Sequence, residues 1–316
     1  MTILVTGAGL IATHTARSLL DQGVGVVIYD PNPSLSYIES VVGPDRKLFH
    51  VEQGDVRDLP HIIDLMLRRG VTRILHTGGL VAPKTEENAS LAFDVNVVGT
   101  RNMIEAARIR SLNRIVFVSS ATVYGRSERT GSGPKEDEPY RPPSSFYAAY
   151  KAACEIIGLA YHQIAGVNLI ICRPCAVYGR RDAVDGGPAS RAIQNALMQA
   201  MSSPAGTTIP LDVPTGERAY VKDVALAVRE AIFVEKPSTR VYNVGSGEIA
   251  SAATFAAAIN QAVPGANVIP ASTGAEAPAP LPLDLTLARA ELKYEPQWPV
   301  QRAITDFADE LRAAAP

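Results

Sequence analysis

A glycine-rich turn near the start of the chain limits its possible folds more than any other feature. The apolar residues 3–5 are followed by Thr6-Gly7-Ala8-Gly9-Leu10-Ile11-Ala12 and then by a helical pattern over 11–22. This G-x-G-x-x-A motif is typical of a turn between a strand and a helix, where the helix N-terminus offers free N–H groups to a pyrophosphate. The motif predicts a dinucleotide site, with cofactor contacts from Gly7, Gly9, Leu10 and Ile11.

An acidic residue follows the turn at the spacing that a dinucleotide site requires. Asp30 closes a predicted strand over 24–29, about 20 residues beyond the glycines. A carboxylate there accepts hydrogen bonds from both adenosine ribose hydroxyls and repels a 2′-phosphate. The following Pro31-Asn32-Pro33 has no basic residue. The sequence therefore predicts NAD rather than NADP as the cofactor.

The rest of the first half alternates strands with helices. The predicted strands are nearly continuously apolar, as expected when both faces of a parallel sheet are covered. This alternation predicts an α/β fold, a doubly wound parallel sheet of the Rossmann type. The predicted strands are 3–6, 24–29, 47–51, 73–76, 114–119, 168–172 and 240–244, and the predicted helices are 11–22, 59–69, 89–110, 146–165 and 222–234.

Two stretches interrupt the alternation and suggest a second part. Residues 180–214 and those after 245 contain helical patterns with Pro-rich connections. We expect 1–179, with 215–245 returning to it, to form the NAD-binding domain, and 180–214 with 246–316 to form an interleaved substrate-binding lobe. Residues 126–145 are rich in Gly, Pro and charge and predict a long loop with Glu136-Asp137-Glu138 facing solvent.

Composition excludes several classes of partner. The chain has 30 Lys and Arg against 32 Asp and Glu, a net charge of -2, so nucleic acid and anionic membranes are not expected partners. Its apolar runs are shorter than the ~20 residues that span a bilayer. The three cysteines and the lack of a visible secretory signal at the start predict a cytoplasmic protein.

Two of the cysteines, Cys172 and Cys175, have C-x-x-C spacing. They lie at a strand end and in a loop rather than at a helix N-terminus, where a reactive thiolate would be stabilised. No histidine lies next to them. We therefore expect ordinary packed thiols and no metal site.

A Tyr-Lys pair carries the expected chemistry. Tyr147 and Lys151 are four residues apart on a predicted helix and so share one face. A lysine ammonium and a positive nicotinamide ring favour the phenolate and lower the pKa of tyrosine from about 10. Tyr147 could then exchange a proton with a substrate hydroxyl while a hydride moves. Ser120 follows the strand at 114–119, at the sheet edge where ligands bind, and Thr122 beside it is expected to contact substrate.

Further motifs follow one another in order along most of the chain, and together they resemble the extended short-chain dehydrogenases/reductases, the NAD-dependent epimerase/dehydratases. Besides the glycine turn and Tyr147 to Lys151, the matching pieces are Gly54-Asp55-Val56, His76-Thr77-Gly78-Gly79, Asn96-Val97-Val98-Gly99-Thr100, Val118-Ser119-Ser120-Ala121-Thr122-Val123-Tyr124-Gly125, Arg173-Pro174-Cys175-Ala176-Val177-Tyr178-Gly179, Tyr220-Val221-Lys222-Asp223-Val224-Ala225 and Tyr242-Asn243-Val244-Gly245.

The resemblance implies roles for particular residues. It implies Ser120, Tyr147 and Lys151 as the catalytic triad, with Lys151 also on the nicotinamide ribose. It implies a homodimer formed through the helices at 89–110 and 146–165. The further cofactor contacts that it implies are Asp55 and Val56 beside the adenine, Thr77, Gly78 and Gly79 beneath the cofactor, Asn96, and Pro174 and Val177 on the nicotinamide side.

The sequence also departs from the family pattern. The glycine turn is one residue shorter than the usual T-G-x-x-G-x-x-G. Ala121-Thr122 replaces the Asp-Glu of dehydratases, which argues against a 4,6-dehydratase. Nucleotide-sugar enzymes carry Asn where Ala176 stands, and an Arg-Asp-Phe element that Gly216-Glu217-Arg218 matches poorly, although Arg218 could partly substitute. These losses favour a smaller or differently charged substrate than a UDP- or dTDP-sugar.

We therefore expect an NAD-dependent oxidoreductase that oxidises a secondary alcohol of a sugar-like or small polar hydroxy substrate. The alternative is a UDP-sugar-type 4-epimerase that retains NAD through turnover. A non-catalytic NAD-sensing scaffold is less favoured, because such relatives commonly lose the Tyr or Lys that this chain keeps. Arg180-Arg181 could bind a carboxylate or phosphate of the substrate, or could be a solvated pair.

Overall fold

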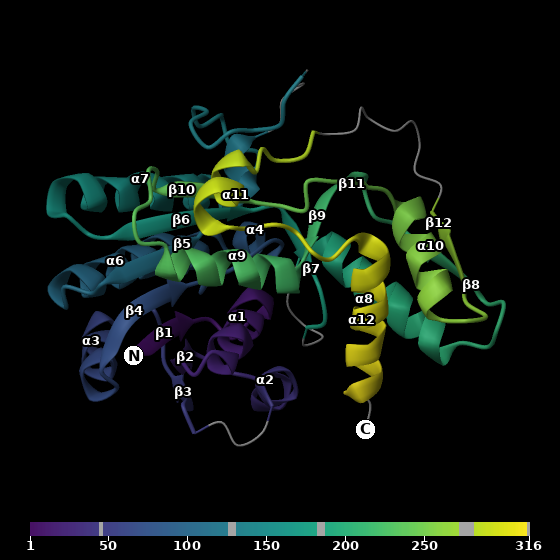
Figure 1. Cartoon of the computed structure of the whole chain (residues 1–316), viewed down its shortest axis with the longest axis horizontal. Helices are drawn as coiled ribbons and strands as arrows, with labels where there is room; N and C mark the ends of the chain where they lie inside the picture. Colours follow the sequence, from purple (N-terminus) through teal and green to yellow (C-terminus); the bar gives the residue numbers. More distant parts are fainter. Residues whose placement is uncertain (44–46, 126–130, 182–186, 272–280, 315–316) are drawn as a thin grey trace.

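A parallel sheet of seven strands forms the centre of the larger part of the molecule (Figure 1). The structure is a computed structural model that describes residues 1–43, 47–125, 131–181, 187–271 and 281–314. The strand order confirms the doubly wound fold. The strands are, from one edge to the other, β10 (Val241–Val244), β6 (Leu169–Pro174), β5 (Arg114–Val118), β4 (Val71–His76), β1 (Thr2–Thr6), β2 (Gly25–Asp30) and β3 (Phe49–Gln53).

Helices cover both faces of this sheet, and this explains the continuous apolar strands. In β1, Ile3 and Val5 pack in the core on one face while Leu4 packs in the core on the other, and all three are fully buried. The first face is covered by α1 (Leu10–Asp21), α2 (Leu35–Val42), α9 (Val221–Phe233) and α11 (Thr286–Leu292). The second face is covered by α3 (Leu59–Arg68), α6 (Gly99–Ile109) and α7 (Phe146–Ala165).

A smaller part with its own apolar core lies beside the sheet (Figure 1). At their carboxyl ends, β6 and β10 lead directly into a second sheet. Its short strands were not predicted, because they lack the apolar runs of the main sheet. The part contains β7 (Ala176–Tyr178), β9 (Gly216–Tyr220), β11 (Ile249–Ala250), a second pair β8 (Thr208–Leu211) and β12 (Asn267–Pro270), and the helices α8 (Pro188–Ser202), α10 (Ala252–Ala262) and α12 (Val300–Ala313). Across the described ranges, the helices are too short or too polar to cross a bilayer.

The helix predicted over 89–110 is present, but its winding changes in the middle. The structure has α5 (Ala89–Phe93), a π-helical turn over Asp94–Val98 and then α6. The carbonyl oxygen of Asn96, inside this turn, accepts hydrogen bonds from the Thr100 hydroxyl at 2.5 Å and from the Cys154 thiol at 3.2 Å. The wider turn thus makes one backbone carbonyl available to side chains of α6 and α7.

The segment before α7 is more firmly held than a surface loop would be. Residues 131–145 contain no helix or strand, as predicted, and 126–130 lie outside the described residues. The expectation that Glu136 faces solvent is wrong, because its side chain is 8% exposed and accepts a hydrogen bond from the Asn243 backbone N–H at 2.8 Å. Asp137, next to it, is exposed.

Candidate active site

The turn between β1 and α1 has a tight end and an open end. Gly7 has φ +82, and a Cβ added to it would lie 3.1 Å from the Gly78 Cα, so this position requires glycine. Its N–H donates to the Tyr29 carbonyl oxygen at 2.8 Å. Gly9 has φ -78, and a Cβ added there would have no described atom within 4 Å. The open space at Gly9 lies at the N-terminus of α1 and fits a pyrophosphate.

Asp30 lies directly beside this turn, at the end of β2. One carboxylate oxygen accepts the Ala8 N–H at 2.9 Å and the other accepts the Asn32 N–H at 2.8 Å. Each oxygen keeps acceptor capacity for a further donor. The turn and the acidic residue are therefore placed together as an NAD site requires.

The loop after β4 forms the opposite side of the turn. Thr77 Oγ1 donates to the Thr6 carbonyl oxygen at 2.7 Å, and the Gly78 N–H donates to Thr6 Oγ1 at 3.3 Å. Asn96 is buried and uses both ends of its amide on the Leu80 backbone, accepting its N–H at 2.7 Å and donating to its carbonyl at 2.9 Å. Asn96 thus supports the loop that holds Thr77, Gly78 and Gly79.

Asp55 and Val56 lie just after β3 and are tied to neighbouring elements. The Arg57 guanidinium, 2.6 Å away, holds the pKa of the Asp55 carboxyl below its usual range. Val56 is buried, and its Cγ2 would lie 2.5 Å from a Cβ placed on Gly99. Glycine in α6 therefore lets Val56 pack closely, and the contact of Asp55 and Val56 with the adenine stays a prediction.

The structure brings Ser120, Tyr147 and Lys151 together. The Ser145 hydroxyl caps α7 by accepting the Ala148 N–H at 3.1 Å, which places Tyr147 in the first turn and Lys151 in the next. Ser120, just beyond β5, lies near enough to the Tyr147 phenol to lower its pKa. Lys151 Nζ lies 5.7 Å from the centre of the Tyr147 ring.

Burial is the largest influence on the pKa values of Tyr147 and Lys151. It raises the pKa of Tyr147 to about 12, opposed by the nearby Ser120. It lowers the pKa of Lys151 to about 8, opposed by the nearby Cys154 and Glu155. The lowering of the Tyr147 pKa that we expect from Lys151 and a nicotinamide ring together therefore stays a prediction. Tyr147 is a proton donor in this state, and an added positive charge is needed to make it a base.

The remaining residues predicted around the nicotinamide and substrate lie at or near the ends of β5 and β6. Thr122 is exposed, and its N–H donates to Ser120 Oγ at 3.2 Å, which leaves the Ser120 proton for another acceptor. Pro174 is buried at the end of β6, and Val177 packs against the cores of both parts. The Leu10 and Ile11 side chains also pack into these two cores.

Arg180 is not placed with the catalytic side chains. Its guanidinium donates to the Ser40 hydroxyl at 2.6 Å and lies 5.5 Å from the Tyr37 ring centre, and both partners belong to α2. Its side chain is buried, so it is not a solvated residue either. These contacts hold the start of the smaller part against α2 and do not support the predicted substrate contact.

The predicted packing of the cysteines is confirmed. Cys154, Cys172 and Cys175 are free and buried. Burial raises the pKa of Cys172 to about 12 and raises that of Cys175 as well, the opposite of what a reactive thiolate needs. Among the residues that the structure describes, no three His, Cys, Asp or Glu side chains group as metal ligands would.

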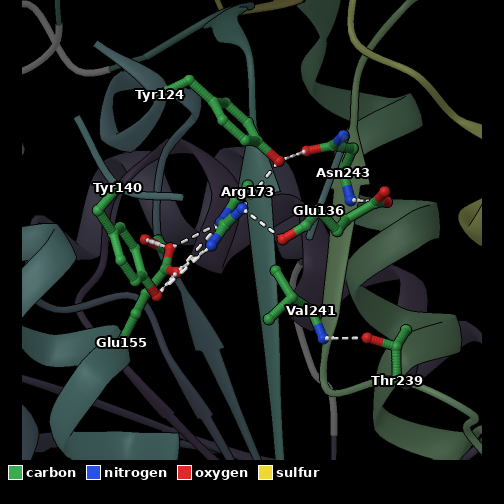
Figure 2. Close-up of polar contacts among 9 residues, drawn as sticks. Tyr124, Glu136, Tyr140, Glu155, Arg173, Thr239, Val241 and Asn243 are labelled. Carbon is green, nitrogen blue, oxygen red and sulfur yellow. Dashed lines mark hydrogen bonds and ion pairs between the residues drawn. The ribbon is translucent and has the colours of Figure 1, made fainter. Parts of the chain in front are cut away.

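A buried ion pair behind the catalytic side chains was not predicted. Arg173 Nη2 lies 2.7 Å from Glu155 Oε2, and neither side chain is more than 3% exposed (Figure 2). Two sequence signals point to it. Glu155 is an acidic residue on the buried face of α7, four residues after Lys151, and Arg173 opens one of the motifs of the resemblance.

Comparisons with known proteins agree with this site. The model of the family described as "NAD dependent epimerase/dehydratase family" matches residues 3–245. The UDP-glucose 4-epimerase of Yersinia pestis is 30% identical over 285 residues, 83% of this chain and 82% of the relative. The 3 beta-hydroxysteroid dehydrogenase/Delta 5-->4-isomerase of Mycobacterium tuberculosis is 29% identical over 187 residues, 57% of this chain and 48% of that protein.

Among solved structures, the UDP-glucose 4-epimerase of Thermus thermophilus in complex with NAD is similar over the whole of both chains. The two share 27% sequence identity and a TM-score of 0.80. The similarity therefore includes the glycine turn, α7 and the smaller part together.

Proposed function

Because the chain belongs to the NAD-dependent epimerase/dehydratase family, we propose that this NAD-dependent enzyme oxidises a secondary alcohol of a sugar-like or small polar hydroxy substrate. The observation that carries the proposal is the group formed by Ser120, Tyr147 and Lys151. We assign substrate binding to the smaller part, whose second sheet continues from the carboxyl ends of β6 and β10. It is formed mainly by the predicted lobe, residues 180–214 and 246–316, and it also takes in β7 and β9, which lie outside those ranges.

The residues present fit NAD. Gly7 and Gly9 form the turn for the pyrophosphate, Asp30 offers acceptors to the ribose, and the loop of Thr77 to Gly79 forms the opposite wall. When bound, NAD supplies the hydride acceptor and a positive charge on its nicotinamide ring.

The protein's own residues handle the proton. The Ser120 oxygen accepts a hydrogen bond from the Thr122 N–H, so the proton of this hydroxyl is available. Ser120 donates this proton in a hydrogen bond to the substrate oxygen. Tyr147 takes the substrate hydroxyl proton once positive charge nearby has lowered its pKa from about 12. Lys151, on the same face of α7, adds such a charge and keeps it fixed.

A second candidate function, 4-epimerisation of a nucleotide sugar, is favoured by the relatives named UDP-glucose 4-epimerase, which match most of the chain. The contacts of Arg218 argue against it. Nη1 and Nη2 of its guanidinium each donate to a backbone carbonyl, of Gly216 and of Pro214, so two of its five N–H donors are directed at the protein rather than at a diphosphate. Its neighbour across the β7–β9 pair, Ala176, offers no side-chain donor.

One screen separates the two functions. The protein is incubated with NAD and a panel of free sugars, polyols, aldonates and UDP-glucose, with Tyr147→Phe as the inactive control. The proposed oxidation gives NADH in proportion to product, whereas epimerisation gives UDP-galactose from UDP-glucose with no net NADH. Oxidation that persists in the Tyr147→Phe protein would refute the assignment of Tyr147.

We further propose a homodimer formed through α5, α6 and α7 in the cytoplasm. Exposed apolar side chains on these helices support the dimer. They include Leu91, Phe93, Ile109, Phe146, Ile156 and Ile164, which are 39–85% exposed. The cytoplasmic location is a separate point, and the three free, buried thiols support it because they suit a reducing compartment. Sedimentation should give the mass of a dimer, and Ile156→Glu should give that of a monomer. A wild-type monomer would refute the proposed dimer.

A further inference from the structure

The buried pair of Glu155 and Arg173 joins α7 to β6 through several hydrogen bonds (Figure 2). Arg173 Nε lies 3.0 and 3.1 Å from the two carboxylate oxygens, and Nη2 lies 2.7 Å from one of them. A guanidinium fork of this kind fixes the direction as well as the distance of the carboxylate. The pair therefore sets how α7 lies on the sheet.

The same carboxylate is tied to the segment that carries the catalytic serine. The Ser119 hydroxyl donates to Glu155 Oε1 at 2.5 Å, and Ser119 directly precedes Ser120. Glu155 lies one helical turn beyond Lys151 and two beyond Tyr147 on α7. One anion thus connects both halves of the catalytic group, the serine just after β5 and the Tyr-Lys pair on α7.

The pair also reaches the segment that leads into α7. Tyr140 donates its hydroxyl proton to Glu155 Oε2 at 2.9 Å. Arg173 Nη1 donates to the Glu136 carbonyl oxygen at 3.1 Å and to the Tyr124 hydroxyl at 2.9 Å. Figure 2 shows Arg173 between Tyr124, Glu136 and the Glu155 carboxylate. Residues 136–140 are therefore held at two points shortly before Tyr147.

A further link extends to the C-terminal segment. Tyr124 donates its hydroxyl proton to Asn243 Oδ1 at 2.7 Å. Asn243 Nδ2 in turn donates to the carbonyl oxygens of Pro134, at 2.9 Å, and Asp284, at 3.0 Å. The hydrogen-bonded network around Arg173 thus connects the catalytic helix with residues more than a hundred positions away in the sequence.

We propose that Glu155 and Arg173 are a positioning pair for catalysis: they hold Ser120 opposite Tyr147 and Lys151 and, through the charge of Glu155, keep Lys151 protonated. The proposal rests on the catalytic roles given to Tyr147 and Lys151 above. It adds two residues that do not touch substrate or cofactor and act through the catalytic side chains.

The stability of the fold alone does not explain why Glu155 and Arg173 are charged residues. A buried ion pair commonly adds little or nothing over apolar side chains of the same volume, because both charges are removed from water. What apolar side chains would not supply is the fixed geometry at Ser119 and a negative charge near Lys151. The carboxylate is needed there because burial favours the neutral amine of Lys151.

Several groups face Lys151 and bear on its charge. On its own helix these are Tyr147, Cys154 and Glu155, and on β4 it is His76, which burial keeps neutral. On β5 the Val118 carbonyl oxygen accepts its proton and the Phe117 ring lies 4.8 Å away. Among these groups Glu155 is the carboxylate, so its neutralisation should act directly on Lys151.

The test is Glu155→Gln, which keeps the side-chain volume and removes the charge. Lysine labelled with ¹³C at Cε reports the titration of Lys151 by NMR, with the signal assigned by its loss in Lys151→Met. We expect the acid dissociation constant of Lys151 to rise at least about tenfold in Glu155→Gln, as loss of a nearby opposite charge does. The kcat for the substrate found in the screen should fall at least about tenfold, with KM changed much less.

The matched control is Asp64→Asn, which removes the carboxylate of an exposed ion pair with Arg68 on α3 with the same separation of 2.7 Å. It should leave the titration of Lys151 and the kcat unchanged. A folded Glu155→Gln protein with the wild-type titration and kcat would overturn the proposal. The titration needs no substrate, so it remains informative if the screen finds no oxidised alcohol.

If Glu155→Gln does not fold, because it leaves Arg173 buried without a counter-ion, the double variant Glu155→Gln with Arg173→Met removes both charges. A folded double variant should still show a kcat at least about tenfold below wild type, because the fork that fixes α7 is gone. A folded double variant with the wild-type kcat would show that the pair has a structural role only and would refute the proposal.

Discussion

The ammonium nitrogen of Lys151 lies 5.7 Å from the centre of the Tyr147 ring and donates a hydrogen bond to the Val118 carbonyl oxygen at 2.8 Å. The cation is therefore held by β5 and lies beside the phenol ring without donating its proton to the phenol oxygen. A charge fixed in this way can favour the phenolate without competing for the proton that Tyr147 exchanges with substrate.

Replacing Tyr147 with phenylalanine should remove activity and leave cofactor binding intact. The variant keeps the ring and its packing but loses the oxygen that accepts the substrate proton. We expect kcat to fall by about 10²–10⁴, with the Kd for NAD changed less than about threefold, measured by turnover and calorimetry. A Tyr147→Phe protein with normal NAD binding and full biological activity would instead support a non-catalytic role.

Replacing Gly7 or Gly9 with alanine should affect the stability of the protein differently, although both glycines lie in the same turn. Alanine at Gly7 is strained by φ +82 and by the Gly78 backbone at 3.1 Å, and should lower stability by at least about 1 kcal/mol. Alanine at Gly9 meets no described atom, so the melting temperature without NAD should stay the same or rise slightly.

The same two variants separate folding from cofactor binding. The methyl group of Gly9→Ala enters the space assigned to the pyrophosphate, so NAD should raise its melting temperature much less than that of the wild type. Thermal denaturation with and without NAD measures both effects. Equal stabilisation of Gly9→Ala and wild type by NAD would place the pyrophosphate elsewhere.

The parts of the site that sequence could predict are those formed by local rules. The turn of Gly7 and Gly9 lies between a strand and a helix that follow each other directly, and Tyr147 and Lys151 share a face because of helix periodicity. In both cases the spacing in the sequence fixes the spacing in space.

The parts that sequence missed depend on partners far along the chain. Glu136 looks like a solvent-facing acid until the Asn243 backbone, 107 residues away, supplies its partner. Arg180 looks like a free cation until α2 packs on it. The π-helical turn at Asn96 likewise depends on the Leu80 and Cys154 contacts of the folded chain.

Asp30 should determine the choice between NAD and NADP. Asp30→Asn keeps an acceptor for the Ala8 N–H but removes the negative charge that repels a 2′-phosphate. We expect NAD to stabilise the variant less than the wild type, and NADP to stabilise it more. Thermal shift with each cofactor measures the ratio. An unchanged preference for NAD would mean that the charge of Asp30 does not act on the ribose.

Buried histidines should make the fold sensitive to mild acid. His76 is fully buried between Thr6 Oγ1, at 2.6 Å, and Thr100 Oγ1, at 2.9 Å. Burial and the nearby Lys151 lower its pKa from 6.5 to about 3. Burial and the neighbouring cations Lys222 and Arg180 lower that of His14 by a similar amount. Both histidines are therefore neutral in the folded protein at pH values where they are charged in the unfolded chain.

The direction in which stability changes with pH follows from the number of protons that the folded and unfolded chains bind. Between pH 6.5 and about 3 the unfolded chain binds more protons at these histidines than the folded protein does, so stability falls as the pH falls through this window and is unaffected by them above it. Each histidine contributes up to about 1.4 kcal/mol per pH unit to this loss of stability.

Urea unfolding at pH 7.5, 5.5 and 4.5 should show this loss. Since His76→Asn keeps a donor and an acceptor without a titrating group, its loss of stability between pH 7.5 and 4.5 should be smaller than that of the wild type. Equal losses in the two proteins would mean that His76 is not neutral in the folded protein.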